Sequence, residues 1–389
     1  MNSFALTDGW TAVIYDEWAF PTSVVEAWEL FARQHGDHAV FIDYVWFENW
    51  WKAFGTPGEL FVIVLMKEDV PKGVFPCRMQ SDVQGSGEPF LHSLTNDHTC
   101  HYAFPIDMGD AVDICEVFVR FMQTHYPNRS MFFDNIAASG PVTTPFAETL
   151  RGAGQPFHEY MQPWAPWMEL GNDAPALLTN LPGRLRKTIK LCRRKAEKEE
   201  SFGFEVFRGG GSLDAMLDKM FDVECRNWKG RNGTAIKSDG RVEKFYRGLA
   251  HDAAKEGRLL LPICTINDRP AAADYCLLSG QSVFTLKTGY DESFGQFSPS
   301  NLLRAEFFTH LIKEKLGTSF HFLGACDAWK MEWTHNTQHY GFIEVFPKSA
   351  KGWSQYALKY GMKGYLKKFS AVRALKEVIE QGKEKTHVG

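Results

Sequence analysis

The sequence predicts a mixed α/β fold, class α/β or α+β, with mostly antiparallel sheets flanked by helices. Strand-like and helix-like periodicities alternate along the chain, which indicates layers of both kinds. Several strand-like segments are separated only by short turns, which favours antiparallel hairpins. The length of 389 residues exceeds what one typical core supports, so we expect two domains, or three.

The first part of the chain alternates strands and helices around one hairpin. The expected strands are Thr11–Tyr15, Leu60–Met66, Gly73–Gln80 and Met131–Asp134. The expected helices are Ser23–His35, Tyr44–Phe54, Asp110–His125 and Pro145–Arg151. The rings of Phe47, Trp50, Trp51 and Phe54 share a helix face, and we expect them in the core rather than around a cofactor.

A proline-rich run follows, Gln162–Trp167, which is either an interdomain strand or a linker. Gly171–Pro175 then interrupts regular structure. We therefore place the domain boundary near residue 170, which gives domains 1–170 and 171–389.

The second part begins with a helix and ends in a helical tail. The expected helices are Leu177–Glu200, Ser212–Asn227, Val242–Glu256, one beginning at Ser298, and a mostly helical basic tail over Lys351–Glu380. The expected strands are Phe204–Phe207, Leu259–Ile266, Ala271–Leu278, Val283–Tyr290, Ser319–Leu323 and Ile343–Phe346. The three strands from Leu259 to Tyr290 are joined by turn sequences, so they form an antiparallel meander.

The helix predicted over Leu177–Glu200 is strongly basic. Its cations are Arg184, Arg186, Lys187, Lys190, Arg193, Arg194, Lys195 and Lys198. Such a run is typical of a surface that binds phosphates, RNA or another anionic partner. The alternative is an ordinary solvated helix face, with Leu185, Ile189 and Cys192 turned inward.

The stretch Val283–Leu316 combines a strand, a polar loop over Asp291–Phe297, and a helix opened by Ser298-Pro299-Ser300. Serine is a good N-cap, and proline suits the first helical position. Free amides at a helix start bind anions, so the stretch predicts a phosphate site. An ordinary strand-loop-helix connection is the alternative.

Composition excludes several classes of protein. The net charge of −4 argues against a general polyanion binder, although a local basic patch remains open. No secretory signal is recognisable at the N-terminus, and no run of about 18 apolar residues predicts a membrane-spanning helix. The eight cysteines show no paired CxxC spacing, so we expect reduced thiols and a cytoplasmic location. His98-Thr99-Cys100-His101 lacks a second ligand pair, and no metal site is expected.

Five short segments in order resemble the CelD-like acetyltransferase family, named from cellulose biosynthesis and related to the Fem peptidyltransferases. They are Tyr44-Val45-Trp46 with Trp50-Trp51, Arg186-Lys187 with Arg193-Arg194-Lys195, Trp228-Lys229-Gly230, Tyr290-Asp291 with Phe294 and Ser298–Leu303, and Phe320–Lys330 with Trp333. The resemblance covers most of the chain and implies two tandem GNAT (N-acetyltransferase) domains. Four positions depart from the family pattern, where His321, Ala325, Cys326 and Trp329 replace an aspartate, a glycine, an acid and a tyrosine.

The resemblance implies acyl transfer from acetyl-CoA or another acyl-CoA to an amine. The residues implied for binding the donor are Lys287, Phe297, Ser298, Pro299, Ser300, Asn301, Leu302 and Leu303. Those implied for the acceptor are Trp228, Lys229, Asp291, Trp329 and Lys330. The thioester would lie between the strands Val283–Tyr290 and Ser319–Leu323, with a backbone N–H of the first strand as oxyanion donor.

The proton-handling candidates are Tyr290, His321, Asp274 and Asp291, each with a structural alternative, which for Asp291 is a turn cap. Tyr290 ends the first strand and either protonates the leaving thiolate or packs. His321 is either a base or an ordinary strand histidine. Asp274 lies in an apolar run, where a carboxylate needs a partner or a raised pKa.

Three functions follow from these patterns. The first is an N-acyltransferase acting on a small-molecule amine, an amino sugar or a cell-envelope precursor. The second is Fem-like transfer from aminoacyl-tRNA, with the basic helix as the RNA contact. The third is a non-catalytic GNAT-fold protein of polysaccharide or envelope assembly, suggested by the departures at His321, Ala325 and Cys326.

Overall fold

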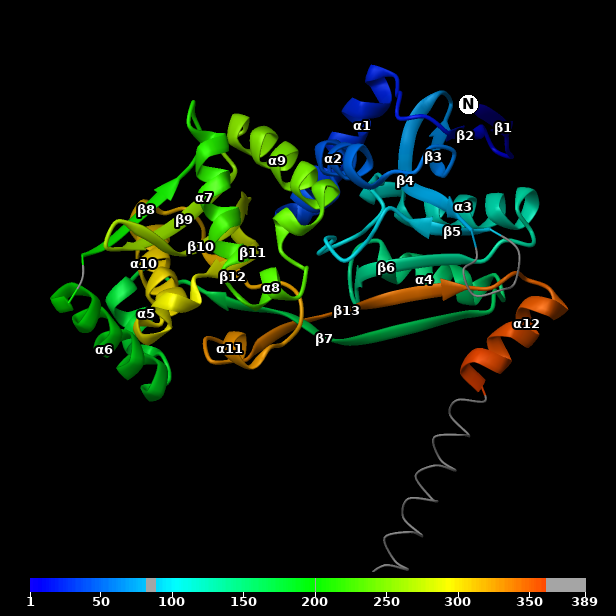
Figure 1. Cartoon of the computed structure of the whole chain (residues 1–389). Coiled ribbons are helices and arrows are strands. Elements are labelled where there is room, and N and C mark those ends of the chain that lie inside the picture. The colour runs from blue at the N-terminus through cyan, green and yellow to red at the C-terminus, as the bar shows by residue number, and fades with distance from the viewer. Residues whose placement is uncertain (82–88, 200, 362–389) are drawn as a thin grey trace, which may run out of the picture.

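The computed structural model describes residues 1–81, 89–199 and 201–361. Within these residues one mixed sheet runs through the molecule, with helices on both faces (Figure 1). The strand order is β1-β2-β3-β4-β5-β6-β13-β7-β12-β11-β10-β9-β8. Most neighbours are antiparallel, and the parallel pairs are β5 with β6 and β11 with β12. The predicted mixed α/β class is confirmed.

The strands are β1 Asn2–Ala5, β2 Trp10–Tyr15, β3 Leu60–Lys67, β4 Val70–Gln80, β5 Phe90–Ser93, β6 Met131–Ala137, β7 Phe157–Glu169, β8 Phe202–Phe207, β9 Leu259–Ile266, β10 Arg269–Ser279, β11 Ser282–Tyr290, β12 Ser319–His321 and β13 Asn336–Val345. The α-helices are α1 Thr22–Arg33, α2 Tyr44–Phe54, α3 Ala111–His125, α4 Thr143–Gly152, α5 Ala174–Asn180, α6 Gly183–Glu199, α7 Leu213–Cys225, α8 Trp228–Arg231, α9 Gly240–Lys255, α10 Pro299–Glu314, α11 Ala328–Met331 and α12 Ala350–Tyr356. Short 3₁₀ segments are η1 Gly36–Phe41, η2 Met108–Asp110, η3 Ile236–Ser238 and η4 Glu292–Phe297, and η5 Ala357–Gly361 is π-helical.

Some predicted elements differ in extent from the observed ones; the strand expected over Ile343–Phe346, for example, is β13 and begins earlier, at Asn336. The basic helix begins later than expected, because Leu181 and Pro182 separate α5 from α6. The residue before a proline is sterically disfavoured in the helical region, which ends the first helix there. The proline-rich run Gln162–Trp167 lies within strand β7, so it is a strand rather than a linker. Glu200 and the predicted tail beyond Gly361 lie outside the described residues.

Strand β13, near the C-terminal end, inserts between β6 and β7 in the sheet. Strand β7 in turn pairs with β12 through Trp167–Glu169. Chain segments far apart in sequence therefore form the centre of the sheet. Gly341 permits this pairing, since a Cβ there would lie 1.7 Å from the carbonyl oxygen of Tyr160.

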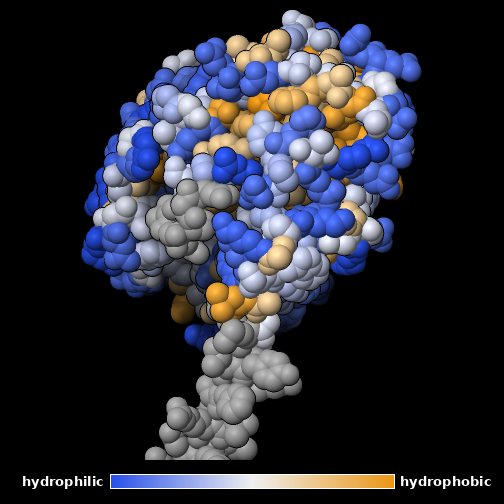
Figure 2. Space-filling view, turned by 90° about the vertical axis from the view of Figure 1, so that its right-hand side faces the viewer, coloured by the Kyte–Doolittle hydropathy of each residue, from blue (hydrophilic) through white to orange (hydrophobic). Residues whose placement is uncertain are grey.

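The abundant aromatic residues lie mainly inside. Phe47 and Trp50 are fully buried, so their predicted core role is confirmed. Helices α2 and α9 contact each other and pack aromatic rings together, among them Trp46 and Phe245 at a centroid distance of 5.3 Å. Hydrophilic residues cover much of the molecular face shown in Figure 2, with hydrophobic residues gathered toward its upper part.

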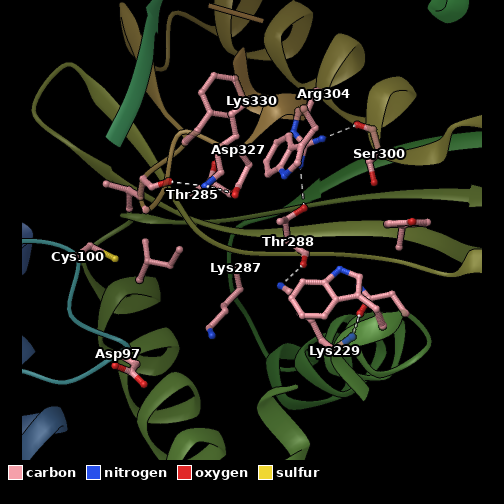
Figure 3. Close-up of a pocket in the computed structure, with 18 of the residues that line it drawn as sticks. Asp97, Cys100, Lys229, Thr285, Lys287, Thr288, Ser300, Arg304, Asp327 and Lys330 are labelled. Carbon is pink, nitrogen blue, oxygen red and sulfur yellow. Dashed lines mark hydrogen bonds and ion pairs between the residues drawn. The ribbon is translucent and has the colours of Figure 1, made fainter. Parts of the chain in front are cut away.

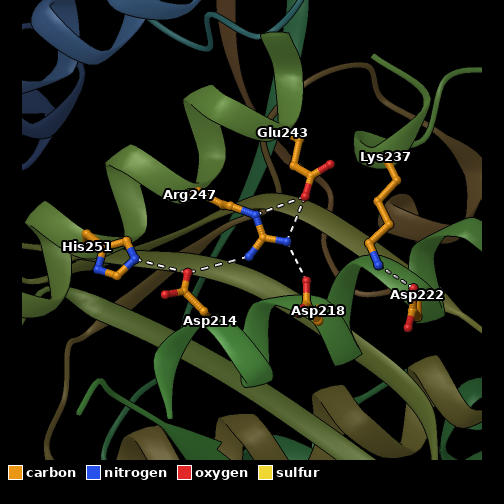
Figure 4. Close-up of polar contacts among 7 residues, drawn as sticks. All are labelled: Asp214, Asp218, Asp222, Lys237, Glu243, Arg247 and His251. Carbon is orange, nitrogen blue, oxygen red and sulfur yellow. Dashed lines mark hydrogen bonds and ion pairs between the residues drawn. The ribbon is translucent and has the colours of Figure 1, made fainter. Parts of the chain in front are cut away.

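A network of charged side chains joins α7 to α9 (Figure 4). Arg247 on α9 forms ion pairs with Asp214 and Asp218 of α7 and with Glu243 of its own helix. Its guanidinium also lies 5.2 Å above the ring of Phe221. These contacts hold α7 against its neighbour and help to fix Glu224, which is buried near the C-terminal end of α7.

Candidate functional site

A cavity of about 830 Å³ lies beside strand β11. Its walls come from β11, the start of α10, the segment after β12, the α8 turn, and three segments from the first part of the chain (Figure 3). The lining residues from the second part include Trp228, Lys229, Thr285, Lys287, Thr288, Tyr290, Ser298, Pro299, Ser300, Asn301, Arg304, Phe322, Trp329 and Lys330. Those from the first part are Asn96, Asp97, Thr99, Cys100, Asp134, Asn135 and Trp164.

Strands β11 and β12 separate at this cavity. They pair only through Ser282–Phe284 and Ser319–His321, whereas β11 continues to Tyr290. Past Phe284 the edge of β11 that faces β12 has no strand partner among the described strands. The register with β10 shifts between Tyr275 and Cys276, so Leu286 is an extra residue on β11. A bulge re-aims backbone groups, and this one lies at the opening between the two strands.

Helix α10 begins at the cavity wall. Pro299 occupies its first turn, as predicted. Ser298 precedes it in the left-handed region, with φ of 47°. The expected serine side-chain cap is absent, because Ser298 Oγ instead accepts a hydrogen bond from Asn301 Nδ2 at 3.0 Å. Non-glycine residues in this region are strained and often mark functional turns, since neighbouring contacts must hold them there.

A buried arginine lies one turn further along α10. Arg304 donates to Thr288 Oγ1 at 2.9 Å and lies 4.2 Å over the ring of Trp329. Asp274 is fully buried 3.8 Å away, and neither of its oxygens has a hydrogen-bond partner among the described residues. Burial raises the pKa of Asp274, with Arg304 opposing. This long ion pair links β10 to the start of α10. Arg304 lines the cavity, whereas Asp274 does not.

Lys229 connects the α8 turn to β11. Its ammonium donates to the Thr288 carbonyl at 2.7 Å and to Glu224 at 3.1 Å. Glu224 is fully buried and also accepts the backbone N–H of Ile236. Helix α7 can approach this closely because Gly289 has no side chain: a Cβ there would lie 2.6 Å from the Cα of Glu224.

Lys330 holds the segment that follows β12. Its ammonium donates to the carbonyls of Leu323 and Ala325, each at 2.8 Å, and pairs with Asp327 at 3.0 Å. Burial lowers the pKa of Lys330, with Asp327 opposing. Since these contacts occupy its three donors, Lys330 positions the wall of the cavity that Trp329 completes.

Lys287 differs from these two lysines. It extends into the cavity from β11, 5.2 Å above the ring of Tyr246 (Figure 3). Among the described residues its ammonium has no hydrogen bond or ion pair. Burial lowers the pKa of Lys287, and the charges of Glu224 and Asp97 oppose this. Lys287 is therefore the cation of this wall that is free to contact a ligand.

Two carboxylates lie in the wall from the first part of the chain. Asp97 is exposed, and Asp134 is half-buried and accepts the N–H of Asn135 at 2.8 Å. Burial raises the pKa of Asp134, and Asp97 adds to this. Asn135 is another non-glycine residue with positive φ, 57°. The two walls thus differ in charge, basic on β11 and acidic opposite.

The predicted site residues lie in several different places. Tyr290, Lys287, Trp228, Lys229, Trp329, Lys330 and Ser298–Asn301 line the cavity. Phe297, Leu302 and Leu303 lie in the core beneath it. Asp291 caps η4 by accepting the N–H of Ser293, and it pairs with Arg226 at 3.3 Å. Asp274 lies behind Arg304.

His321 lies outside the cavity lining, in an imidazole cluster where His321 and His101 are buried and His38 is half-buried. Its ring is 6.1 Å from that of His38, which is 4.8 Å from His101. His321 Nε2 shares a hydrogen bond with Ser319 Oγ at 3.2 Å, while its Nδ1 has no partner among the described residues. Burial lowers the pKa of His321 to about 3, with His38 contributing.

The residues of the sequence His98-Thr99-Cys100-His101 have separate contacts. His98 stacks on Phe54, whereas His101 shares a hydrogen bond with Tyr340 at 3.2 Å. Cys100 lines the cavity. No cluster of three or more His, Cys, Asp or Glu residues with metal-binding geometry occurs in the part of the chain that the structure describes.

Sequence reasoning missed Arg304, Thr288 and the whole wall from the first part of the chain. Arg304 follows Ser300 by four residues, one helical turn, and that spacing could have identified it. Asp134 on β6 and Trp164 on β7 reach the cavity through the long-range pairing of β13 with β6 and β7, and of β7 with β12, for which the sequence offers no local signal. Asp97 lies in the segment that follows β5.

Comparisons with known proteins agree with this fold. Residues 183–331 match the family model described as an acetyltransferase (GNAT) domain. A comparison with curated proteins gives no match.

Solved structures similar to the chain include FemX, with TM-score 0.55, 10% identity, and coverage of 89% of this chain and 97% of that one. A conserved protein of unknown function from Bacteroides thetaiotaomicron gives TM-score 0.52 at 9% identity, covering 86% and 99%. The C-terminal domain of a putative lysylphosphatidylglycerol synthetase from Agrobacterium fabrum gives a TM-score of 0.51 at 11% identity. That match covers 85% of this chain and 93% of that one. At these identities the likeness shows the fold, and residues 183–331 are the part of that fold that matches a GNAT-type acetyltransferase domain.

Proposed function

We propose that the chain is an N-acyltransferase that moves an acetyl or longer acyl group from acyl-CoA to an amine bound in the cavity. The observation that supports this most is the separation of β11 from β12 beside the start of α10. An extended thioester arm fits between two diverging strands, because the free strand edge offers backbone hydrogen bonds. The helix start at Ser300 and Asn301 fits the negative phosphates of the donor.

In the reaction, the amine nitrogen bonds to the thioester carbonyl carbon and the carbon–sulfur bond breaks. The thiol leaves with a proton, and the amine loses one. Negative charge develops on the carbonyl oxygen, and a backbone N–H near the bulge at Leu286 is the proposed donor that stabilises it.

We propose Tyr290 as the acid that protonates the leaving thiolate, since it lines the cavity at the end of β11. His321 and Asp274 are the weaker candidates, because His321 lies in the imidazole cluster and Asp274 lies behind Arg304. Lys287 is the cation we propose to contact the donor or the acceptor directly.

The acceptor we propose is a small amine, such as an amino sugar or an envelope precursor. The acidic wall of Asp97 and Asp134 suits an ammonium group. The resemblance of the five sequence segments to the CelD-like branch is consistent with such a substrate.

A second candidate is transfer from aminoacyl-tRNA, which the exposed cations of α6 favour. Retention of tRNA at low salt separates the two, because phosphate contacts are strongest there. Absence of retention removes this candidate.

Release of free thiol from acetyl-CoA and longer acyl-CoAs, measured with a panel of amines, tests the main proposal. We expect amine-dependent thiol release that falls about a hundredfold in Tyr290→Phe. His321→Ala serves as the comparison variant, for which we expect a smaller loss. If no thioester is consumed with any amine, the proposal is wrong, and a non-catalytic GNAT-fold protein becomes the better description.

A further inference from the structure

Helix α6 has two faces of opposite character. Leu185, Ile189 and Cys192 are buried, which confirms the inward face predicted from the sequence, and Ala196 is buried with them. On the outward face lie the exposed cations Arg184, Lys187, Lys190, Arg194 and Lys198. Among the described residues none of these five side chains forms an ion pair. A chain of net charge −4 thus concentrates positive charge on one short surface.

This surface adjoins the cavity. Lys195 of α6 donates to the Gln296 side chain at 3.0 Å, and Cys192 Sγ contacts the Gln296 carbonyl at 3.9 Å. Gly295 and Ser298, on either side of that segment, line the cavity. Arg193 also forms an ion pair with Glu306 of α10. The basic helix is therefore anchored to the same turn that opens the proposed donor site.

The size of the surface favours a macromolecular ligand. Arg184 and Lys198 are about 21 Å apart along the helix axis, from the rise of 1.5 Å per residue. The phosphates of one nucleotide would engage only part of such a length. A ligand that uses all five cations must extend along the helix.

The chemistry of the surface favours a protein over single-stranded nucleic acid or a lipid surface. Leu191 is 68% exposed among the cations, and an apolar side chain ringed by charge is typical of a protein interface. Helix α6 contains no aromatic residue, whereas surfaces for single-stranded nucleic acid usually provide stacking rings. One exposed leucine is also too little for membrane insertion, which needs a continuous apolar face.

We propose that the outward face of α6 docks a small acidic protein that delivers the acyl group as a thioester on a covalently attached pantetheine arm. This inference rests on the proposed acyl transfer. The arm enters between β11 and β12 while the acidic protein stays on α6. The acceptor nitrogen bonds to the carbonyl carbon, the carbon–sulfur bond breaks, and the arm leaves as a thiol that takes up a proton.

The test compares three acetyl donors: an acetylated acyl carrier protein, acetyl-CoA, and acetyl-pantetheine. In the double variant Lys187→Glu, Lys190→Glu we expect KM for the carrier-bound donor to rise about tenfold or more, since each reversal replaces an attraction by a repulsion. KM for acetyl-pantetheine should stay within about twofold, because that donor has no charge. The matched control is Arg120→Glu, Lys348→Glu, which changes net charge equally at exposed positions on other parts of the surface.

Binding of labelled carrier protein, followed by fluorescence anisotropy at low and high salt, tests the docking proposal separately from the proposed acyl transfer. Salt-sensitive binding that the α6 reversal abolishes supports docking even if no thioester is consumed, in which case the proposed reaction alone fails. Turnover of acetyl-pantetheine without carrier binding at low salt overturns the docking proposal alone. The docking proposal is also overturned if the double variant raises KM for acetyl-CoA as much as KM for the carrier-bound donor. It is overturned as well if the protein retains RNA and the same double variant abolishes that retention.

Discussion

The imidazole cluster predicts a steep loss of stability in mild acid. The exposed fractions of His101 and His321 are 6% and 5%, and burial holds the pKa of His321 near 3 and that of His101 well below its usual value. Asp37 is the carboxylate that acts on His321, and His38 is the nearest imidazole. Among the described residues none of these three rings forms an ion pair with a carboxylate, so a proton on one of them would lie among the other rings.

The direction of the change in stability with pH follows from the depressed pKa values of these histidines. In the unfolded chain these imidazoles take up protons near pH 6.5, whereas in the folded chain they stay neutral, so the unfolded state binds more protons as pH falls. Their contribution is complete above about pH 6.5 and is lost as pH falls toward the folded-state values. Below about pH 6.5 each ring lowers the free energy of unfolding by about 1.4 kcal/mol per pH unit. For His101 and His321 together the free energy of unfolding falls by about 4 kcal/mol between pH 7 and pH 5.

Urea unfolding followed by tryptophan fluorescence at a series of pH values measures this loss. In His321→Gln, which retains a nitrogen near the Ser319 hydroxyl, the slope should fall by about 1.4 kcal/mol per pH unit. His335→Gln, at an exposed position, is the matched control. A free energy of unfolding that stays constant from pH 7 to pH 5, or an unchanged slope in His321→Gln, would refute the reasoning.

Three further predictions concern the walls of the cavity. Gly289→Ala places a Cβ against the backbone of α7 and should lower the melting temperature by several degrees, whereas Gly295→Ala, with no atom within 4 Å, should not. Lys229→Met leaves the buried Glu224 carboxylate without its cation and should cost about 3 kcal/mol in urea unfolding, a loss that Lys229→Met with Glu224→Leu should largely recover. Trp228 is 50% exposed, so Trp228→Ala should leave the melting temperature unchanged while raising KM for donor or acceptor about threefold to tenfold. A lowered melting temperature with unchanged KM would assign Trp228 to packing instead.

Local patterns predicted the secondary elements of the site well. The periodicity of Leu259–Ile266 and the turn sequences after it lead directly to the meander β9, β10 and β11. Pro299 marks the start of α10 for a simple steric reason. The exact conformation of Ser298 was beyond this reasoning, because its positive φ depends on contacts with Asn301 and the turn before it.

The parts of the site that depend on long-range strand pairing could not be predicted from the sequence. Strand β13 joins β6 and β7 across about two hundred residues of sequence, and that pairing brings Asp134 and Trp164 to the cavity. The roles of charged residues depended on partners in the same way. Lys229, Lys287 and Lys330 look alike in the sequence, but only Lys287 lacks a partner among the described residues. Its difference arises entirely from tertiary contacts.

Calorimetric titration with acetyl-CoA tests the central claim most directly. The account predicts saturable binding at one site that Ser300→Glu abolishes, because a carboxylate at the start of α10 repels the donor phosphates. Ser139→Glu, the same substitution at an exposed position in the first part of the chain, should bind as the unaltered protein does. Absence of binding to the unaltered protein, or equal binding by Ser300→Glu, would contradict a donor site between β11 and β12.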